Sequence, residues 1–179
     1  MNICVYGAAS DAIRLSYLDS AYRLGQTIAE AGHTMVFGAG CTGVMGAAAK
    51  GVLAEGGCLI GIAPSFFHTP GVLEENCTEL ILTETMRERK DLLESKSDMF
   101  VAAPGGIGTL DEFFEIFTLR TLEQHRKPVV LLNTDGCWDA LIRLLDDFVA
   151  GGLMKAEYRD LLYVVREPEE LRAIWKTME

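Results

Sequence analysis

Residues 99–112 read MFVAAPGGIGTLDE, an apolar run that passes through three glycines into the start of a helical pattern. The run at 99–102 is apolar at every position, which is typical of a strand covered on both faces of a parallel sheet. Downstream, residues 109–123 carry apolar side chains at helical spacing. This stretch therefore predicts a strand, a glycine loop and a helix, the repeating unit of an α/β protein.

The same alternation of short apolar runs and longer helical patterns continues on both sides of this unit. We expect strands at 2–6, 34–37, 58–62, 79–82, 99–102, 128–132 and 162–165. We expect helices near 16–31, 43–56, 86–97, 109–123, 137–150 and 168–176, with Gly32 and Gly56 ending the first two. No linker, internal repeat or charge block divides the chain. The sequence thus predicts an α/β fold: one Rossmann-like domain over residues 1–179, with a mostly parallel sheet of about seven strands flanked by helices.

The composition narrows the classes of partner. Of 179 residues, 49% are hydrophobic and 23% are charged, as in an ordinary soluble globular protein with no membrane segment. The 16 basic and 26 acidic residues give a net charge of −10, which disfavours a surface that coats nucleic acid. The start of the chain has no signal-peptide pattern, and the five cysteines are scattered as in reduced, cytoplasmic proteins. The three histidines lack metal-ligand spacing, so we expect no metal site and no cofactor.

Glycine is the unusual residue, with 18 in the chain against 5 prolines. We expect these glycines in tight loops that bind anions, because they allow backbone angles closed to other residues and let N–H groups converge on a phosphate. The loop at 104–109 precedes a helix whose N-terminus adds partial positive charge. Thr109 and Glu112 have the spacing of a capping box, so the carboxylate has two interpretations. It either caps the helix or faces the ribose and a water beside the anomeric carbon.

A second glycine loop, at 38–43, reads GAGCTG and matches the pattern GxGxxG. This pattern indicates dinucleotide binding when it follows the first strand and an acidic residue ends the next one. Here it follows the second strand, and the next strand ends without Asp or Glu. A tight turn with close packing of helix on strand is therefore the competing interpretation.

A short basic segment lies between the fourth and fifth expected strands, with Arg87, Arg89 and Lys90 inside four positions. One interpretation is a solvated helix start, capped by Thr85 and Glu88. The other is a site for a phosphate and an electron-rich leaving group, because the segment follows a strand at the same sheet edge as the glycine loops.

The two motifs Met86-x-x-Arg89-Lys90 and PGGxGTxxE at 104–112, about 14 residues apart, resemble those of the LOG (Lonely Guy) family. These proteins are cytokinin riboside 5′-monophosphate phosphoribohydrolases, often labelled lysine decarboxylases, and the similarity extends over nearly the whole chain. The resemblance implies hydrolysis of nucleoside 5′-monophosphates, AMP included, to free base and ribose 5-phosphate by a homodimer.

The resemblance also implies roles for individual residues. Arg89 and Glu112 would be the catalytic pair. The other implied contacts are with the nucleotide, and they fall in four segments: Ser10; Gly40, Gly43 and Gly46; Met86 and Lys90; and the phosphate loop Gly105, Gly106, Gly108 and Thr109.

Three departures from the family pattern bear on substrate choice. Ala8 and Ala9 stand where the first loop usually has Gly and Ser, so the contribution of that loop is in doubt. Ala39 replaces the middle of a common triple glycine, and Arg87 stands where many members have His. None of these changes touches Arg89 or Glu112.

Other functions remain open at this point. A nucleotide-binding sensor or carrier would use the same loops without catalysis. A lysine decarboxylase would need Lys90 or Lys96 to hold pyridoxal phosphate, and a thiol hydrolase would need a histidine beside Cys41. The helix at 109–123 has apolar residues on more than one face, which fits either burial under neighbouring elements or a homodimer interface: Leu110, Phe113, Phe114, Ile116, Phe117, Leu119 and Leu122.

Overall fold

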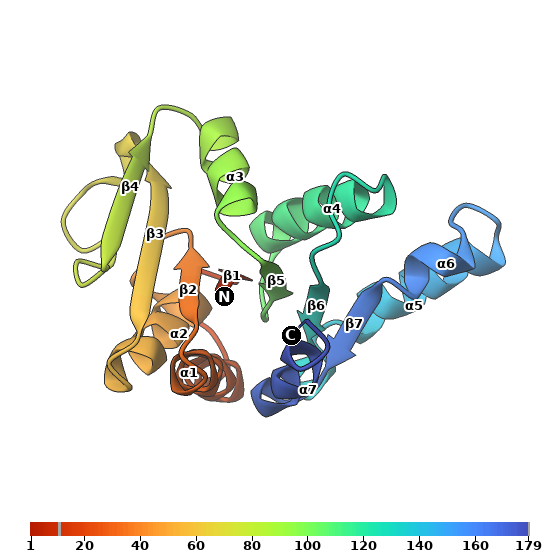
Figure 1. Cartoon of the computed structure of the whole chain (residues 1–179), viewed down its shortest axis with the longest axis horizontal. Helices are drawn as coiled ribbons and strands as arrows, with labels where there is room; N and C mark the ends of the chain where they lie inside the picture. The colour runs from red at the N-terminus through yellow and green to blue at the C-terminus, as the bar shows by residue number, and fades with distance from the viewer. Residues whose placement is uncertain (11, 179) are drawn as a thin grey trace.

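A single seven-stranded sheet organises the protein (Figure 1). The computed structural model describes residues 1–10 and 12–178. All strand pairs are parallel, in the order β4-β3-β2-β1-β5-β6-β7, which confirms the predicted α/β fold. The strands are β1 (Asn2–Tyr6), β2 (Thr34–Phe37), β3 (Cys58–Pro64), β4 (Glu79–Thr83), β5 (Met99–Ala102), β6 (Val129–Leu132) and β7 (Leu162–Val165).

Helices cover both faces of this sheet. The α-helices are α1 (Leu15–Glu30), α2 (Gly43–Ala54), α3 (Met86–Ser95), α4 (Ile107–Thr121), α5 (Asp139–Ala150), α6 (Ala156–Arg159) and α7 (Leu171–Trp175). Short 3-10 turns lie at Ser65–Phe67, Thr134–Gly136 and Pro168–Glu170. Helices α1, α2 and α7 form one layer, and α3, α4 and α5 form the other (Figure 1).

Alternate residues of each strand supply these two cores. In β1, Ile3 and Val5 pack into the core under α1, α2 and α7, whereas Cys4 and Tyr6 pack into the core under α3, α4 and α5. Both side-chain directions are therefore buried, which explains why the central strands are apolar at every position.

The sheet has its topological switch point at β1. The strand order runs outward from β1 through β2 in one direction and through β5 in the other. In open parallel sheets the crevice between such diverging connections binds ligands, at the carboxyl ends of the strands. The loops after β1, β2 and β5 all open at this point, and they include both glycine loops.

Most expected element boundaries agree with the structure to within two residues, and three differences stand out. Helix α4 begins at Ile107 rather than residue 109, because Gly106 is its N-cap. The expected helix at 168–176 is a 3-10 turn followed by α7. The sequence analysis missed the single-turn helix α6, which is too short to show a periodic pattern. Across the described residues, none of the helices combines the length and apolar character needed to span a membrane.

Two glycines allow α1 and α2 to touch through their backbones. A Cβ atom on Gly25 would lie 2.0 Å from the carbonyl oxygen of Ala48, and one on Gly51 would lie 2.0 Å from that of Tyr22. Gly32 and Gly56, by contrast, follow the ends of α1 and α2 with φ of 70° and 66°, the left-handed conformation expected of helix-ending glycines.

Substituting Gly51 tests this close helix contact. We expect Gly51→Ala to destabilise the protein by about 1–3 kcal/mol, because the methyl group must push α1 and α2 apart. Urea unfolding measures this, with Lys50→Ala at the neighbouring exposed position as the control. A Gly51→Ala protein that is more stable than the wild type, as helix propensity alone would make it, would contradict the contact.

Candidate active site

A cavity of about 610 Å³ opens at the carboxyl edge of the sheet, above the switch point. Its walls come from the loops after β1, β2 and β3 and from the first turns of α3 and α4. The residues that line it are Gly7, Ala8, Ala9, Ser10, Gly38, Gly40, Thr42, Met45, Phe67, Gly71, Val72, Leu73, Met86, Arg89, Gly106, Gly108, Thr109, Asp111 and Glu112.

A buried ion pair crosses this cavity. Arg89 Nη1, from α3, donates to Glu112 Oε1, from α4, at 2.7 Å, and the two side chains are only 10% and 11% exposed. Arg89 Nε also donates to the carbonyl oxygen of Ile62 in β3 at 3.2 Å, which fixes the guanidinium plane. Gly38 makes room for it, since a Cβ there would lie 2.2 Å from Arg89 Nη2. The structure thus brings together the two residues that the sequence analysis paired.

The environment of Glu112 shifts its acidity. Burial raises the pKa of this carboxyl above its ordinary value of 4.5, although the Arg89 guanidinium opposes the shift. The charged carboxylate is therefore lost at a higher pH than in an exposed glutamate as the solution is acidified. A carboxylate that is dehydrated and held by one arginine is suited to stabilise a cation or to take a proton from water.

The capping-box interpretation of Thr109 and Glu112 is wrong. Thr109 lies inside the first turn of α4, since the N-cap is Gly106, and the hydrogen bond recorded for the Glu112 carboxylate comes from Arg89. The buried Thr109 side chain lines the cavity instead, and Gly105 leaves space for it, with a would-be Cβ 2.1 Å from Thr109 Oγ1.

The glycines of the loop at 104–109 do not have the unusual backbone angles that the sequence analysis expected. None of Gly105, Gly106 and Gly108 has a positive φ, so special backbone angles do not explain them. A Cβ on Gly106 or Gly108 would meet open space within the cavity wall. The missing side chains therefore leave the first N–H groups of α4 accessible, and such N–H groups with the helix dipole attract an anion.

The three glycines that the family resemblance implies as nucleotide contacts in and after the second glycine loop have different positions. Gly40 lines the cavity. Gly43 has a φ of 62°, and a Cβ added to it would lie 2.5 Å from the carbonyl oxygen of Ala8. A Cβ added to Gly46 would lie 2.2 Å from the carbonyl oxygen of Cys41. Neither Gly43 nor Gly46 lines the cavity, which supports close packing rather than dinucleotide binding for this motif.

The residues of the basic segment and its neighbour Met86 point to different places. Met86, the first residue of α3, lines the cavity beside Arg89, whereas Arg87 is exposed outside it. Lys90 does not line this cavity, and its ammonium lies 2.5 Å from Glu115 Oε2 and 3.4 Å from Asp111 Oδ2. The predicted capping box of α3 is confirmed, with Glu88 N donating to Thr85 Oγ1 at 3.2 Å.

The sequence analysis missed one wall of the cavity. Phe67, Val72 and Leu73, from the segment between β3 and β4, line the cavity together with Met45 of α2. This segment is tied to the second glycine loop by backbone bonds, from Cys41 N to Val72 O at 3.1 Å and from Glu74 N to Ala39 O at 2.8 Å. No motif marks it, and the available signal was its position after a strand at the carboxyl edge.

The first loop contributes more than its departures from the family pattern indicated. Gly7, Ala8, Ala9 and Ser10 all line the cavity, so the polar contact expected of Ser10 has the right position. The hydroxyl of Ser10 accepts from the N–H of Ala12 at 3.3 Å. Among the four loop residues that line the cavity, Ser10 is the one with a polar side chain.

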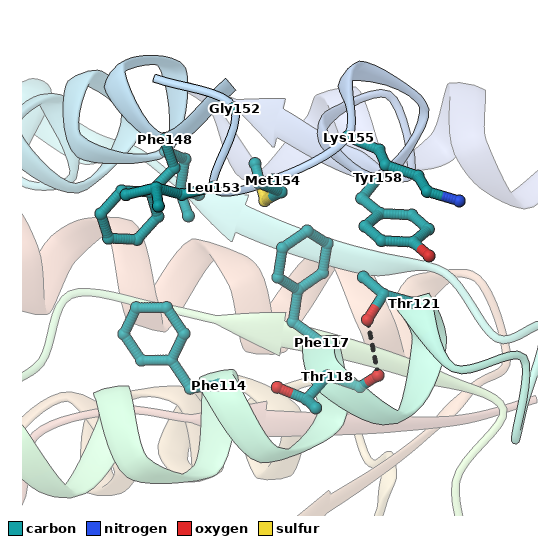
Figure 2. A pocket seen from close by; sticks show the side chains of 11 residues that line it. Phe114, Phe117, Thr118, Thr121, Phe148, Gly152, Leu153, Met154, Lys155 and Tyr158 are labelled. Atoms are coloured by element: carbon teal, nitrogen blue, oxygen red, sulfur yellow. Dashed lines mark hydrogen bonds between the residues drawn. The ribbon is translucent and has the colours of Figure 1, made fainter. Parts of the chain in front are cut away.

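A second groove, of about 750 Å³, is lined by residues other than the ion pair (Figure 2). Phe114, Phe117, Thr118 and Thr121 of α4 form one side. The other side comes from Phe148 of α5, from Tyr158 of α6 and from the loop between these helices, with Leu153, Met154 and Lys155. This groove holds none of the predicted catalytic or nucleotide-binding residues.

Comparison with known proteins shows the family of this chain. Residues 45–174 match a family model described as "Possible lysine decarboxylase". A probable cytokinin riboside 5′-monophosphate phosphoribohydrolase of Oryza sativa subsp. japonica is 36% identical over 170 residues, which cover 94% of this chain and 76% of the rice protein. The cytokinin riboside 5′-monophosphate phosphoribohydrolase of Mycobacterium tuberculosis is 37% identical over 91% of this chain and 87% of its own length. The chain belongs to the LOG family.

The solved structures that resemble this chain include proteins named as binding or carrying the molybdenum cofactor. The molybdenum cofactor carrier protein of Chlamydomonas reinhardtii is 26% identical, with a TM-score of 0.74, over 98% of this chain and 96% of its own. A molybdenum cofactor binding protein of Rippkaea orientalis is 25% identical, with a TM-score of 0.72, over 99% and 94% of the two chains. The fold therefore occurs in proteins named as hydrolases and in proteins named as carriers.

Substituting Gly108 tests whether an anion binds at the start of α4. We expect Gly108→Ala to weaken binding of ribose 5-phosphate at least tenfold, because the methyl group would occupy the space beside the free N–H groups. Stability should stay the same or rise by about 0.5–1 kcal/mol, since alanine suits a helix better than glycine. Calorimetric titration and urea unfolding measure the two effects. Gly151→Ala, at the end of α5, is the matched control, and wild-type affinity in Gly108→Ala would contradict the proposed anion site.

Proposed function

We propose that this protein hydrolyses the N-glycosidic bond of nucleoside 5′-monophosphates, AMP and cytokinin nucleotides among them, to a free base and ribose 5-phosphate. The observation that carries the proposal is the buried Arg89–Glu112 pair, one helical turn from the open N-terminus of α4 in the same cavity. The names of the rice and mycobacterial relatives support the same reaction.

The phosphate group would bind at the start of α4. Gly106, Gly108 and the Thr109 hydroxyl surround the helix N-terminus, where N–H groups and the helix dipole favour a dianion. The ribose would then extend toward Glu112, and the base toward Met86 and the apolar wall. Because the phosphate positions the sugar, the free nucleoside should be a poor substrate.

Glu112 would act on the sugar. Cleavage of an N-glycosidic bond passes through an oxocarbenium-like state, with positive charge on the ribose ring. The carboxylate stabilises this charge and takes a proton from the attacking water. The water oxygen then bonds to C1′, the bond from C1′ to the base breaks, and the base leaves with its electron pair and takes up a proton.

Arg89 would support both partners of this reaction. Its pKa stays too high for it to donate a proton, so its role is electrostatic. Held by Ile62 O, the guanidinium keeps the Glu112 carboxylate oriented and stabilises negative charge that develops on the departing base. A proton then neutralises this negative charge, and the neutral free base is released.

Lysine decarboxylation, the activity in the description of the family model, has less support from the site. None of the described residues that line the cavity is a lysine. Lys90 pairs with Glu115 and Asp111, and Lys96 pairs with Glu79 at 3.6 Å. Both lysines considered as Schiff-base candidates are therefore engaged outside the cavity. Cys41, the candidate thiol nucleophile, donates to Gly71 O at 3.0 Å and does not line the cavity.

A nucleotide-binding carrier is the second candidate function. The similarity to molybdenum cofactor carriers over nearly the whole chain favours it. A carrier would use the phosphate loop and the apolar wall without chemistry, whereas hydrolysis needs the Arg89–Glu112 pair. Binding of AMP without release of adenine would decide for the carrier.

We further propose a cytoplasmic homodimer. The five cysteines are free thiols, as expected in the cytoplasm. Phe113, Ile116 and Phe117 of α4 are buried against the sheet, while Ile107 and Leu122 are 86% and 61% exposed. The outer face of α4 and the apolar groove beside it (Figure 2) would be covered by a second copy.

The proposed reaction is tested with a panel of AMP, N6-isopentenyl-AMP and adenosine, scored by chromatography for released base. We expect both nucleotides to be cleaved and adenosine to have at least 100-fold lower kcat/KM. Glu112→Gln should lower kcat at least 100-fold, because it removes the carboxylate charge, and should leave nucleotide binding measurable by calorimetry. Glu157→Gln, an exposed carboxylate on α6, is the matched control. Wild-type turnover in Glu112→Gln would rule out the role given to this residue.

Light scattering tests the homodimer. We expect twice the mass of the 19.6 kDa chain. Phe114→Glu, in the groove, should shift the mass toward the monomer, because a charge would be buried at the interface, whereas Leu15→Glu, exposed on α1, should not. A monomeric wild-type protein at micromolar concentration would contradict this part of the proposal.

A further inference from the structure

Lys90 makes a second ion pair directly behind the first. It follows Arg89 on α3, and its ammonium lies 2.5 Å from Glu115 Oε2, a carboxylate oxygen that is fully buried. On α4, Glu115 follows Glu112 by three residues, so both carboxylates lie on the face of α4 toward α3. Two cations of α3 thus meet two carboxylates of α4, Arg89 with Glu112 and Lys90 with Glu115.

A small space lies between Glu112 and the Lys90–Glu115 pair. A cavity of about 10 Å³, close to the room of one water molecule, is lined by Tyr6, Lys90, Glu94, Glu112, Glu115 and Ile116. Glu112 lines both this small space and the 610 Å³ cavity. Lys90 lines the small space but not the 610 Å³ cavity. The ammonium of Lys90 is therefore on the side of Glu112 away from the substrate.

The charged groups around this space come from α3 and α4. Burial raises the pKa of Cys4 to about 12 and that of Tyr6 above its ordinary value, so these groups of β1 are neutral at pH 7. The charged groups are Arg89, Lys90 and Glu94 of α3 and Asp111, Glu112 and Glu115 of α4. Without Lys90, three carboxylates of α4 would share one cation, Arg89.

We propose that Lys90 is a positioning residue, which neutralises Glu115 so that Arg89 serves Glu112 alone. It acts from behind the catalytic pair and does not contact the nucleotide, in contrast to the role that the family resemblance implies for it. Although the Glu115 side chain is 38% exposed, its Oε2 atom is out of solvent and would lose its cation, so loss of Lys90 would draw the guanidinium from Glu112 toward Glu115. The proposal rests on the hydrolase function given above.

The decisive experiment compares Lys90→Met, Glu115→Gln and the double variant. Lys90→Met should lower kcat for AMP at least tenfold and leave KM and the affinity for ribose 5-phosphate within threefold of wild type. Glu115→Gln should lower kcat less than threefold, because Arg89 then has no competitor. The double variant should recover to within threefold of Glu115→Gln, since the uncompensated carboxylate is gone.

Each alternative has a different outcome. If Lys90 binds the nucleotide, Lys90→Met weakens ribose 5-phosphate binding and Glu115→Gln does not rescue it. If Lys90 only ties α3 to α4, Glu115→Gln is as harmful as Lys90→Met and the double variant is no better. Either result would overturn the proposal. Lys96→Met, which removes the exposed ion pair with Glu79 on the same helix, is the control and should keep kcat within twofold.

A crystal structure of Lys90→Met tests the proposal without catalysis. We expect the Arg89 guanidinium to contact Glu115 in the variant. An unchanged Arg89–Glu112 contact would contradict the positioning role whether or not the wild type releases base. A wild type that releases no base, with the exchanged contact present in the variant, would refute the hydrolase function and leave the charge compensation standing.

Discussion

The contact between Arg89 and Glu112 is the interaction on which the site depends. Two opposite charges are held 2.7 Å apart and nearly out of solvent, so each stabilises the other only while the geometry holds. Leaving one such charge unpaired in a protein interior costs about 3–5 kcal/mol. The Ile62 carbonyl fixes the guanidinium, Gly38 leaves space for it, and α3 and α4 carry the two residues to the same crevice.

The start of α4, beside this pair, would allow an acidic protein to hold an anionic ligand. The net charge of −10 is spread over the chain, whereas the site combines a buried arginine with the N-terminus of α4. A phosphate would be attracted by the N–H groups and the helix dipole at this end of α4, and the distant carboxylates are screened by solvent. The same charge disfavours long polyanions, which would contact the acidic surface as well.

Much of this arrangement could be predicted from the sequence, because its main signals are local. Runs such as Val129–Leu132 are apolar at each position and mark buried parallel strands, and the two motifs contain Arg89 and Glu112, which form the buried ion pair. Packing between distant segments was not predictable in the same way. The wall formed by Phe67 and Leu73 has no motif, and Lys90 pairs with Glu115 because of how α3 lies against α4. The start of α4 was placed two residues late, because Thr109 has the spacing of a cap while its side chain is buried in the cavity wall.

The central claim is that water attacks the sugar carbon of a bound nucleotide, and an isotope experiment tests it directly. The protein is incubated with AMP in water enriched in ¹⁸O, and the masses of the products are measured by mass spectrometry. The account predicts unlabelled adenine and ribose 5-phosphate that carries one ¹⁸O atom at C1′. Labelled inorganic phosphate with adenosine, or AMP recovered intact from a tight complex, would contradict it.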